Sequence, residues 1–379
     1  MFSTIFLQLI VFFLPTQLGL HFWPEFSRAA GIKVDYLSPT LYLVDLLLIF
    51  YISLSFSSII KWIRHHLSPV LIFLVFVFVN TFFSISPLNA LFWWAHLILY
   101  TVFFLVLRLR KVRWTDIKTP LLASTLLIIF LEVIQLVNQS SVGGLFYWLG
   151  ERAFSTSTPG LARISFFGHD FVRAPSTFSH PNSLAGYLMV VYYLFHVYRS
   201  SLWQRLVIFL GLLLTFSKAA LLAFLLVISL HANPVFLIWF FTIFSFLQPF
   251  VSAIPTSIQF ISDRVFLLTP TKDIILESSL MGVGLGGFIP SLALHLPGSH
   301  LLSEKLQPVH NLPLLLLSEI GLIGLGIIIL LIRNKYKKNH YKKILALLAI
   351  VIITGAFDHY WWTLPQNKLI LLLAGAVLL

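Results

Sequence analysis

The sequence has no cysteine and few charged residues. Of its 379 residues, 10% are charged and 59% are hydrophobic. A soluble domain has about 25% charged residues, so this composition excludes an ordinary soluble protein. Without cysteine the chain forms no disulfide and offers neither a thiolate nucleophile nor a cysteine ligand for a metal. The composition therefore predicts a single polytopic membrane domain over residues 1–379.

Acidic residues are also scarce, with 13 Asp and Glu against 25 Lys and Arg. The resulting net charge of +12 would indicate nucleic acid binding in a soluble protein. In a membrane protein, lysine and arginine instead collect in the cytoplasmic loops. We therefore expect membrane lipids as neighbours and no nucleic acid partner.

Long apolar runs dominate the sequence, and a helix that spans a bilayer needs about 17–25 residues. We expect about 12 transmembrane helices, at residues 4–20, 41–60, 68–86, 90–107, 120–137, 183–198, 205–217, 218–232, 234–251, 311–332, 344–357 and 367–379. The seventh and eighth are separated at Ser217-Lys218, because a lysine is costly at the bilayer centre. One long tilted helix is the alternative there, and it would invert the topology of everything that follows.

The basic residues test this topology. With the N-terminus inside, most of them fall in the turns after the second, fourth, sixth and tenth runs. This asymmetry predicts that both termini are cytoplasmic. The fold expected is thus an all-α integral membrane fold.

Two extracytoplasmic loops, about 138–182 and 252–310, are longer than most connections. Their aromatic residues, glycines and spaced apolar residues predict folded segments with short interfacial helices. An amphipathic helix is expected near residues 262–277. No inverted repeat relates the two halves, which disfavours a secondary transporter.

Four groups of polar residues are candidates for a site on the outer face. In the first loop, Arg173, His180 and Asn182 precede a helix whose positive N-terminus attracts anions. The alternative is a capped helix with an arginine at the lipid headgroups. The second group is Lys218, at the outer mouth of two short helices, where snorkelling to the interface is the alternative.

The other two groups lie toward the C-terminus. His310, followed by Asn311, begins the tenth helix, and histidine is the usual general base near neutral pH. Asp358 and His359 precede two tryptophans, and they either support the site or belong to an aromatic interfacial anchor. The glycine-rich stretch 282–287 lacks the preceding strand of a dinucleotide fingerprint. It is expected to let the backbone approach a substrate or a neighbouring helix.

Taken in order, these motifs resemble the superfamily of O-antigen ligases and Wzy-type O-antigen polymerases, over roughly residues 170–330. The residues that carry the resemblance are Thr177–Asn182, Thr215–Lys218, Arg264, Gly282–Gly286, and His310-Asn311 with Gly321 and Gly324. The family's usual arginine in the second motif is Lys218 here. Lysine keeps the charge but loses the bidentate geometry of arginine.

The resemblance implies an enzyme of the bacterial cytoplasmic (inner) membrane. Such enzymes move a glycan from an undecaprenyl-pyrophosphate carrier to an acceptor hydroxyl on the extracytoplasmic face, without a metal or cofactor. Ligases act on a glycolipid acceptor, polymerases on a second lipid-linked repeat, and related oligosaccharyltransferases on protein hydroxyls. The family's essential arginine and histidine map onto Arg264 and His310.

The residue chemistry fits such a reaction independently. The cations Arg264 and Lys218, with Arg173, suit the growing charge on a pyrophosphate leaving group. His310 suits the proton of the attacking hydroxyl, and direct attack would invert the anomeric carbon. A ligase is favoured and a polymerase is the alternative. A flippase or permease is the less favoured reading, because its ionisable residues should lie near the midplane. A single outward pocket joining His310, Arg264 and Lys218 would favour transfer.

Overall fold

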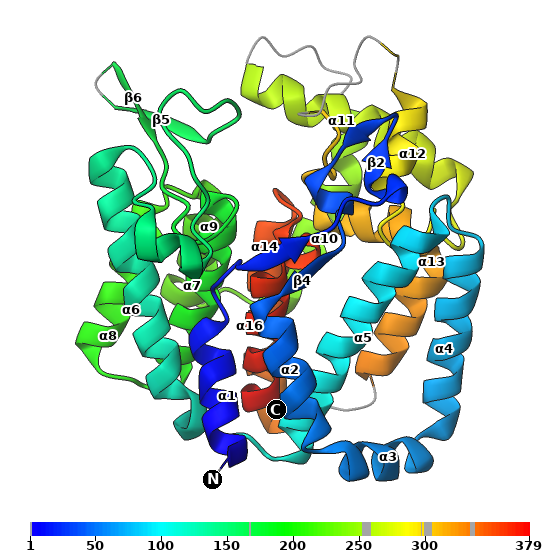
Figure 1. Ribbon diagram of the computed structural model, residues 1–379, viewed down its shortest axis with the longest axis horizontal. Coiled ribbons are helices and arrows are strands. Elements are labelled where there is room, and N and C mark those ends of the chain that lie inside the picture. Colours follow the sequence, from blue (N-terminus) through cyan, green and yellow to red (C-terminus); the bar gives the residue numbers. More distant parts are fainter. Residues whose placement is uncertain (1, 167, 252–258, 297, 299–304, 334–337) are drawn as a thin grey trace.

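The computed structural model describes residues 2–166, 168–251, 259–296, 298, 305–333 and 338–379, and this part of the chain is mostly helical (Figure 1). The helices are α1 (Phe2–Phe13), α2 (Leu43–Ser53), α3 (Phe56–His65), α4 (Leu67–Phe82), α5 (Pro87–Leu109), α6 (Trp114–Asn138), α7 (Pro181–Val197), α8 (Leu202–Leu214), α9 (Lys218–Ala223), α10 (Pro234–Val251), α11 (Gln259–Glu277), α12 (Phe288–His295), α13 (Leu312–Arg333), α14 (Lys338–Gly355), α15 (Tyr360–Thr363) and α16 (Pro365–Leu378). The expected all-α fold is therefore confirmed.

Each of the twelve apolar runs contains a helix, but many of these helices are short. Among the described residues, α5, α6 and the stretch 312–330 of α13 are long and apolar enough to cross a membrane. The pair α2 and α3 would make a fourth span if the 74° bend between them lies within one crossing. These helices indicate a membrane protein, whereas twelve crossings remain a prediction.

The break at Ser217-Lys218 is present. Helix α8 ends at Leu214, Phe216 has a positive φ of 51°, and α9 begins at Lys218. A π-helical turn, Phe224–Ser229, extends α9. Two short helices thus occupy the place of the alternative single long helix.

Both long loops are folded where the structure describes them. The first contains a 3₁₀ helix, η3 (Gly144–Leu149), and an antiparallel hairpin of β5 (Arg163–Phe166) and β6 (His169–Val172). The second contains α11 and α12. In Figure 1 the hairpin, α11 and α12 lie at one end of the bundle, and both termini lie toward the other.

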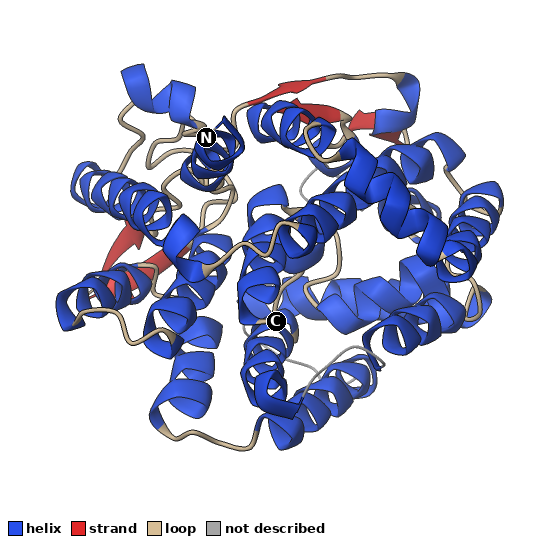
Figure 2. Cartoon of the chain, turned by 90° about the horizontal axis from the view of Figure 1, so that it is seen from below, coloured by secondary structure: helices blue, strands red, loops and turns tan. Residues whose placement is uncertain are grey.

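The segment between α1 and α2 also folds into short elements. Strand β1 (Gly19–His21) pairs with β4 (Thr40–Tyr42), and β2 (Arg28–Ala29) pairs with β3 (Ile32–Lys33). Two 3₁₀ helices, η1 (Glu25–Ser27) and η2 (Asp35–Leu37), connect them. Figure 2 shows the strands at the margin of the helices.

The glycine-rich stretch packs against α13, as one of the two alternatives predicted. Helix α13 is kinked at Gly321, whose φ of 62° and ψ of −173° are non-helical. The N–H groups of Leu322 and Ile323 donate to the carbonyls of Ser279 and Leu280, at 2.9 and 3.1 Å. A side chain at Gly321 would place its Cβ 2.3 Å from the Leu280 oxygen. Glycine is therefore required where these two backbones meet.

Asn80 of α4 holds the same turn from the other side. Its Nδ2 donates to the carbonyls of Met281 and Glu319, at 3.0 and 3.1 Å. Its Oδ1 accepts from the Leu285 N–H and from Nε1 of Trp94, both at 3.0 Å. The buried amide is fully satisfied, so it fixes the turn to α4, α5 and α13.

Candidate functional site

Asp358 is the centre of a polar cluster at the ends of several helices. It lies between α14 and α15 and is 7% exposed. Its Oδ1 lies 3.6 Å from Nδ1 of His310 and 4.0 Å from Nε2 of His359. Its Oδ2 accepts a hydrogen bond from Nδ2 of Asn182 at 3.0 Å. Three segments distant in sequence therefore meet at one buried carboxylate.

His180 and Asn182 reach this cluster from the start of α7. His180 is the N-cap, and its Nδ1 accepts a hydrogen bond from the Asn182 N–H at 3.1 Å. Pro181 occupies the first helical position, where a missing N–H costs nothing. The helix is therefore capped by His180, as the alternative reading expected, and the Asn182 side chain that follows the cap reaches Asp358.

Arg173 extends the cluster to the turn between α8 and α9. Its guanidinium donates to Oδ1 of Asn182 at 2.8 Å and, through Nε, to the carbonyl of Thr215 at 2.9 Å. Asn182 thus lies between a cation and an anion and bonds to both. The structure brings together Arg173, His180, Asn182, His310, Asp358 and His359, all of which were sequence candidates.

The cluster controls the charge of Asp358. Burial by itself raises the pKa of this carboxyl, but the neighbouring imidazoles, His310 first and then His359 and His180, hold it well below its usual range. Asp358 is therefore a carboxylate at neutral pH.

His359 connects the cluster to the segment between α1 and α2. Its ring lies 5.2 Å from that of His310, and its Nδ1 lies 2.9 Å from Oγ1 of Thr363. The ring of Tyr36 packs edge-on against it at 5.6 Å. Burial and the Asp358 charge raise the pKa of Tyr36 to about 12, so its phenol is neutral at physiological pH.

Two histidines and the carboxylate at the centre of the cluster have the composition of a metal site. His310, Asp358 and His359 each offer a ligand atom, all within 4.8 Å of one another. Metal–ligand distances near 2.1 Å would bring tetrahedral ligand atoms to about 3.4 Å apart. The separations of 3.6 and 4.0 Å exceed this, and the Asp358 oxygens already accept from Asn182 and from the His359 N–H. The geometry fits a carboxylate paired with imidazoles better than a metal centre.

Three predicted site residues are not part of the cluster as described. Asn311 is fully buried and instead bonds to Gln248 of α10 at 3.0 Å, while its Oδ1 accepts the Leu314 N–H as a cap of α13. Lys218 begins α9 with an exposed side chain. Arg264 lies on α11, and its side chain falls outside the described residues.

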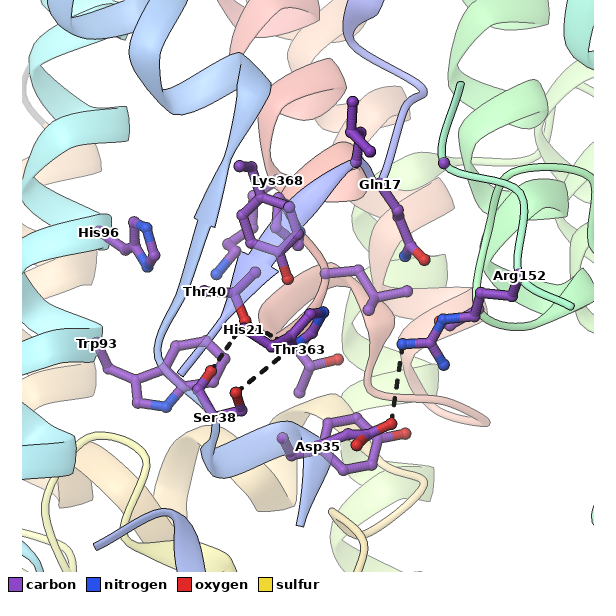
Figure 3. Close-up of a pocket in the computed structure, with 18 of the residues that line it drawn as sticks. Gln17, His21, Asp35, Ser38, Thr40, Trp93, His96, Arg152, Thr363 and Lys368 are labelled. Carbon is purple, nitrogen blue, oxygen red and sulfur yellow. Dashed lines mark hydrogen bonds and ion pairs between the residues drawn. The ribbon is translucent and has the colours of Figure 1, made fainter. Parts of the chain in front are cut away.

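A cavity of about 360 Å³ adjoins the cluster (Figure 3). Thr363 and Tyr36, which contact His359, also line this cavity. Ser179, beside the N-cap His180, lines it too. Neither His310 nor Lys218 is among the lining residues, so this cavity is not the pocket joining His310, Arg264 and Lys218 that would favour transfer.

Sequence reasoning missed most of the cavity's polar lining. His21 and Asp35 lie in the segment between α1 and α2, Arg152 follows η3, and Lys368 lies in the last apolar run. The lysine is the signal that was available, because a charged residue inside an apolar run indicates a functional site.

The comparisons with known proteins bear on none of these residues. No protein-family model, curated protein or solved structure matches the chain.

Proposed function

We propose that the chain is a membrane glycan transferase of the O-antigen ligase type. It would move a glycan from an undecaprenyl-pyrophosphate carrier to an acceptor hydroxyl on the extracytoplasmic side of the bacterial inner membrane. The observation that supports this most is the pairing of His310 with the buried Asp358 carboxylate, beside Arg173 and a cavity. The likeness of the motifs to that superfamily supplies the substrate class.

His310 is proposed as the general base. Its Nδ1 faces the Asp358 carboxylate. Its side chain is 24% exposed, more than the side chains of Asp358 and His359. A paired carboxylate orients an imidazole and stabilises the imidazolium that forms when it takes a proton. Nε2 of His310 then accepts the proton of the attacking hydroxyl.

The cations are proposed to bind the leaving group. The bond between the anomeric carbon and the pyrophosphate oxygen breaks as the bond to the acceptor oxygen forms. The carrier leaves as undecaprenyl pyrophosphate, and the configuration at the anomeric carbon inverts. Arg173 is held toward the cluster by Asn182 and Thr215. With Lys218 and Arg264 it would stabilise the charge that grows on the leaving oxygen.

The test is transfer by the full-length protein reconstituted in liposomes with an undecaprenyl-pyrophosphate glycan and candidate acceptors. His310→Ala should lower the rate at least about 100-fold, as loss of a general base does. His169→Ala, at an exposed position on β6, is the matched control and should be active. Full transfer by His310→Ala would refute the mechanism.

Substitution of Lys218 gives a second test of the mechanism in the same transfer assay. Lys218→Arg should keep more activity than Lys218→Ala, because the charge rather than the ammonium geometry is required. Equal activity of both variants and the wild type would remove Lys218 from the proposal.

The same assay separates the alternatives. Transfer to a glycolipid core indicates a ligase, and elongation of a second lipid-linked repeat indicates a polymerase. Movement of the lipid-linked glycan across the liposome bilayer without transfer would favour the flippase or permease reading.

A further inference from the structure

The cavity next to the cluster has features that the proposed mechanism does not use. Its walls come from the β1–β4 segment, from α5, from the loop after η3 and from the start of α16. Figure 3 shows Lys368 and Trp93 on one side of it, and Arg152 directed at Asp35 on another. Its volume of about 360 Å³ lies in the range of small-molecule sites.

Lys368 is the most informative residue in this cavity. It is 9% exposed, and its Nζ lies over the rings of Trp93 and Tyr100, at 4.7 and 5.5 Å from their centroids. Within the described part of the chain, it has neither a hydrogen bond nor an ion pair with a carboxylate. A buried ammonium without an anion is costly, which indicates that the cavity accommodates one.

The carboxylates near Lys368 are committed elsewhere. Those whose charge acts on it are Asp45 and Glu319. Asp45 accepts hydrogen bonds from Tyr100 and from the Tyr42 N–H, both at 3.0 Å, and lies 3.1 Å from Nε2 of His96. Glu319 accepts from Nε1 of Trp362 at 2.8 Å.

The carboxylate of Glu151, which lines the cavity, is also occupied. Its two oxygens accept the N–H groups of Val142 and Gly143 at 2.7 Å, and Gln135 donates to it at 2.8 Å. Asp35 pairs with Arg152 at 3.9 Å. Among the described residues, Lys368 is therefore a buried cation of the lining that forms no ion pair with a carboxylate.

The remaining lining suits a sugar ring. Trp93, Tyr36 and Tyr42 supply aromatic surface, and hydroxyls of Ser38 and Thr40 lie 3.4 and 3.0 Å from Nδ1 of His21. Aromatic surface with a few fixed polar groups is typical of small-molecule sites. Thr363 and Tyr36 place this lining directly beside His359.

We propose that this cavity binds a saccharide carrying an anionic substituent, a carboxylate or a phosphate, with Lys368 contacting the anion. Under the proposed function, on which this assignment of a role depends, the saccharide is part of the acceptor. The cavity would then hold the acceptor beside the base while the cations of the cluster hold the carrier pyrophosphate.

Binding can be measured without the donor, so it does not depend on transfer. The probes are methyl glucuronide, glucose 6-phosphate and neutral methyl glucoside, added to the full-length protein in detergent and followed by saturation-transfer NMR. We expect at least one anionic probe to bind about tenfold or more tightly than the neutral one. Comparison of the two anionic probes distinguishes carboxylate from phosphate.

Lys368→Met should abolish this preference, whereas Lys272→Met, at a half-exposed position on α11, should keep it. Equal binding of neutral and anionic probes by the wild-type protein would overturn the proposal, and this result needs no variant. An unchanged preference in Lys368→Met would also overturn it. Anion-selective binding in a protein that transfers no glycan would overturn the proposed function and leave the cavity assignment standing.

Discussion

Asn182 donates a hydrogen bond from Nδ2 to Oδ2 of Asp358 at 3.0 Å, although 176 residues separate them. Its Oδ1 accepts from Arg173 at 2.8 Å. The neutral amide of Asn182 thus bridges the Arg173 guanidinium and the Asp358 carboxylate, which come from different segments, and lies between the two charges.

Replacing this amide should destabilise the protein. Asn182→Ala removes both hydrogen bonds and leaves two partly buried charged groups each short of a partner, which costs about 1–3 kcal/mol. Thermal unfolding in detergent measures the loss. Asn138→Ala, at the exposed end of α6, is the matched control and should change stability by less than about 0.5 kcal/mol. If both variants behave alike, the bridge contributes nothing to stability.

The low pKa of Asp358 predicts an acid-sensitive stability. A carboxyl whose pKa is lower in the folded than in the unfolded state stabilises the fold above the unfolded pKa, near 3.9, and this contribution is lost as the pH falls through the folded pKa. Wild-type stability should therefore fall below about pH 4.

The variant Asp358→Asn isolates this effect. It should be less stable than the wild type at pH 7 and should lose less stability between pH 5 and pH 3. Thermal unfolding across this range is the measurement, and Asp273→Asn, half-exposed on α11, is the control that should follow the wild-type curve. Parallel curves for Asp358→Asn and the wild type would contradict the expectation.

The kink in α13 predicts a sharp difference between two glycines of one helix. Gly321→Ala forces a non-glycine residue into backbone angles that cost about 1–3 kcal/mol and brings its Cβ against the Leu280 carbonyl. Gly326→Ala meets nothing within 4 Å and should be neutral or slightly stabilising, because alanine favours helix. The measurement is the melting temperature of each variant. Similar values for the two would mean that the kink at Gly321 does not contribute to stability.

The contact between His295 of α12 and Glu277 of α11 should stabilise the fold at low pH, which is the opposite of the pH dependence expected for Asp358, and its effect should be smaller. Nε2 of His295 lies 3.2 Å from Oε2 of Glu277. Burial lowers the pKa of His295, but the Ser291 carbonyl and Glu277 raise it overall. The contribution is therefore present below the unfolded pKa near 6.5 and is lost as the pH rises through the folded value.

Glu277→Gln should accordingly reduce stability at pH 5 but not at pH 9. The reduction should stay below about 1 kcal/mol, because Glu277 is 66% exposed and its charge is screened. Glu25→Gln, which is 90% exposed, should show no such difference between the two pH values. A loss of equal size at both pH values would assign the effect to packing.

Much of the helical arrangement could be predicted from the sequence, because each apolar run contains a helix. The bend between α2 and α3 could not. No proline or glycine marks it, and its backbone is held by Arg110, which donates to Oγ of Ser55 at 2.7 Å and to the Leu54 carbonyl at 2.9 Å. Such a contact between distant residues has no local periodicity to reveal it.

The candidate site was predicted in part for a similar reason. His180 and Asn182 were identified because they precede a helix N-terminus, which is a local signal, and His310 and Asp358 because they begin or follow apolar runs. Asn311 was predicted to bind substrate, yet its side chain accepts the Leu314 N–H at the start of α13 and donates to Gln248. The cavity around Lys368 escaped prediction because Trp93 approaches that lysine from another helix.

The bridge at Asn182 also sets an order of events during biosynthesis. At about 5–20 residues per second, the 176 residues between Asn182 and Asp358 take on the order of ten to forty seconds to emerge from the ribosome. Throughout that interval the nascent chain has Arg173 and His180 but lacks the Asp358 carboxylate. The pairing of His310 with Asp358, on which the proposed function rests, therefore forms only after nearly all of the chain has been synthesised.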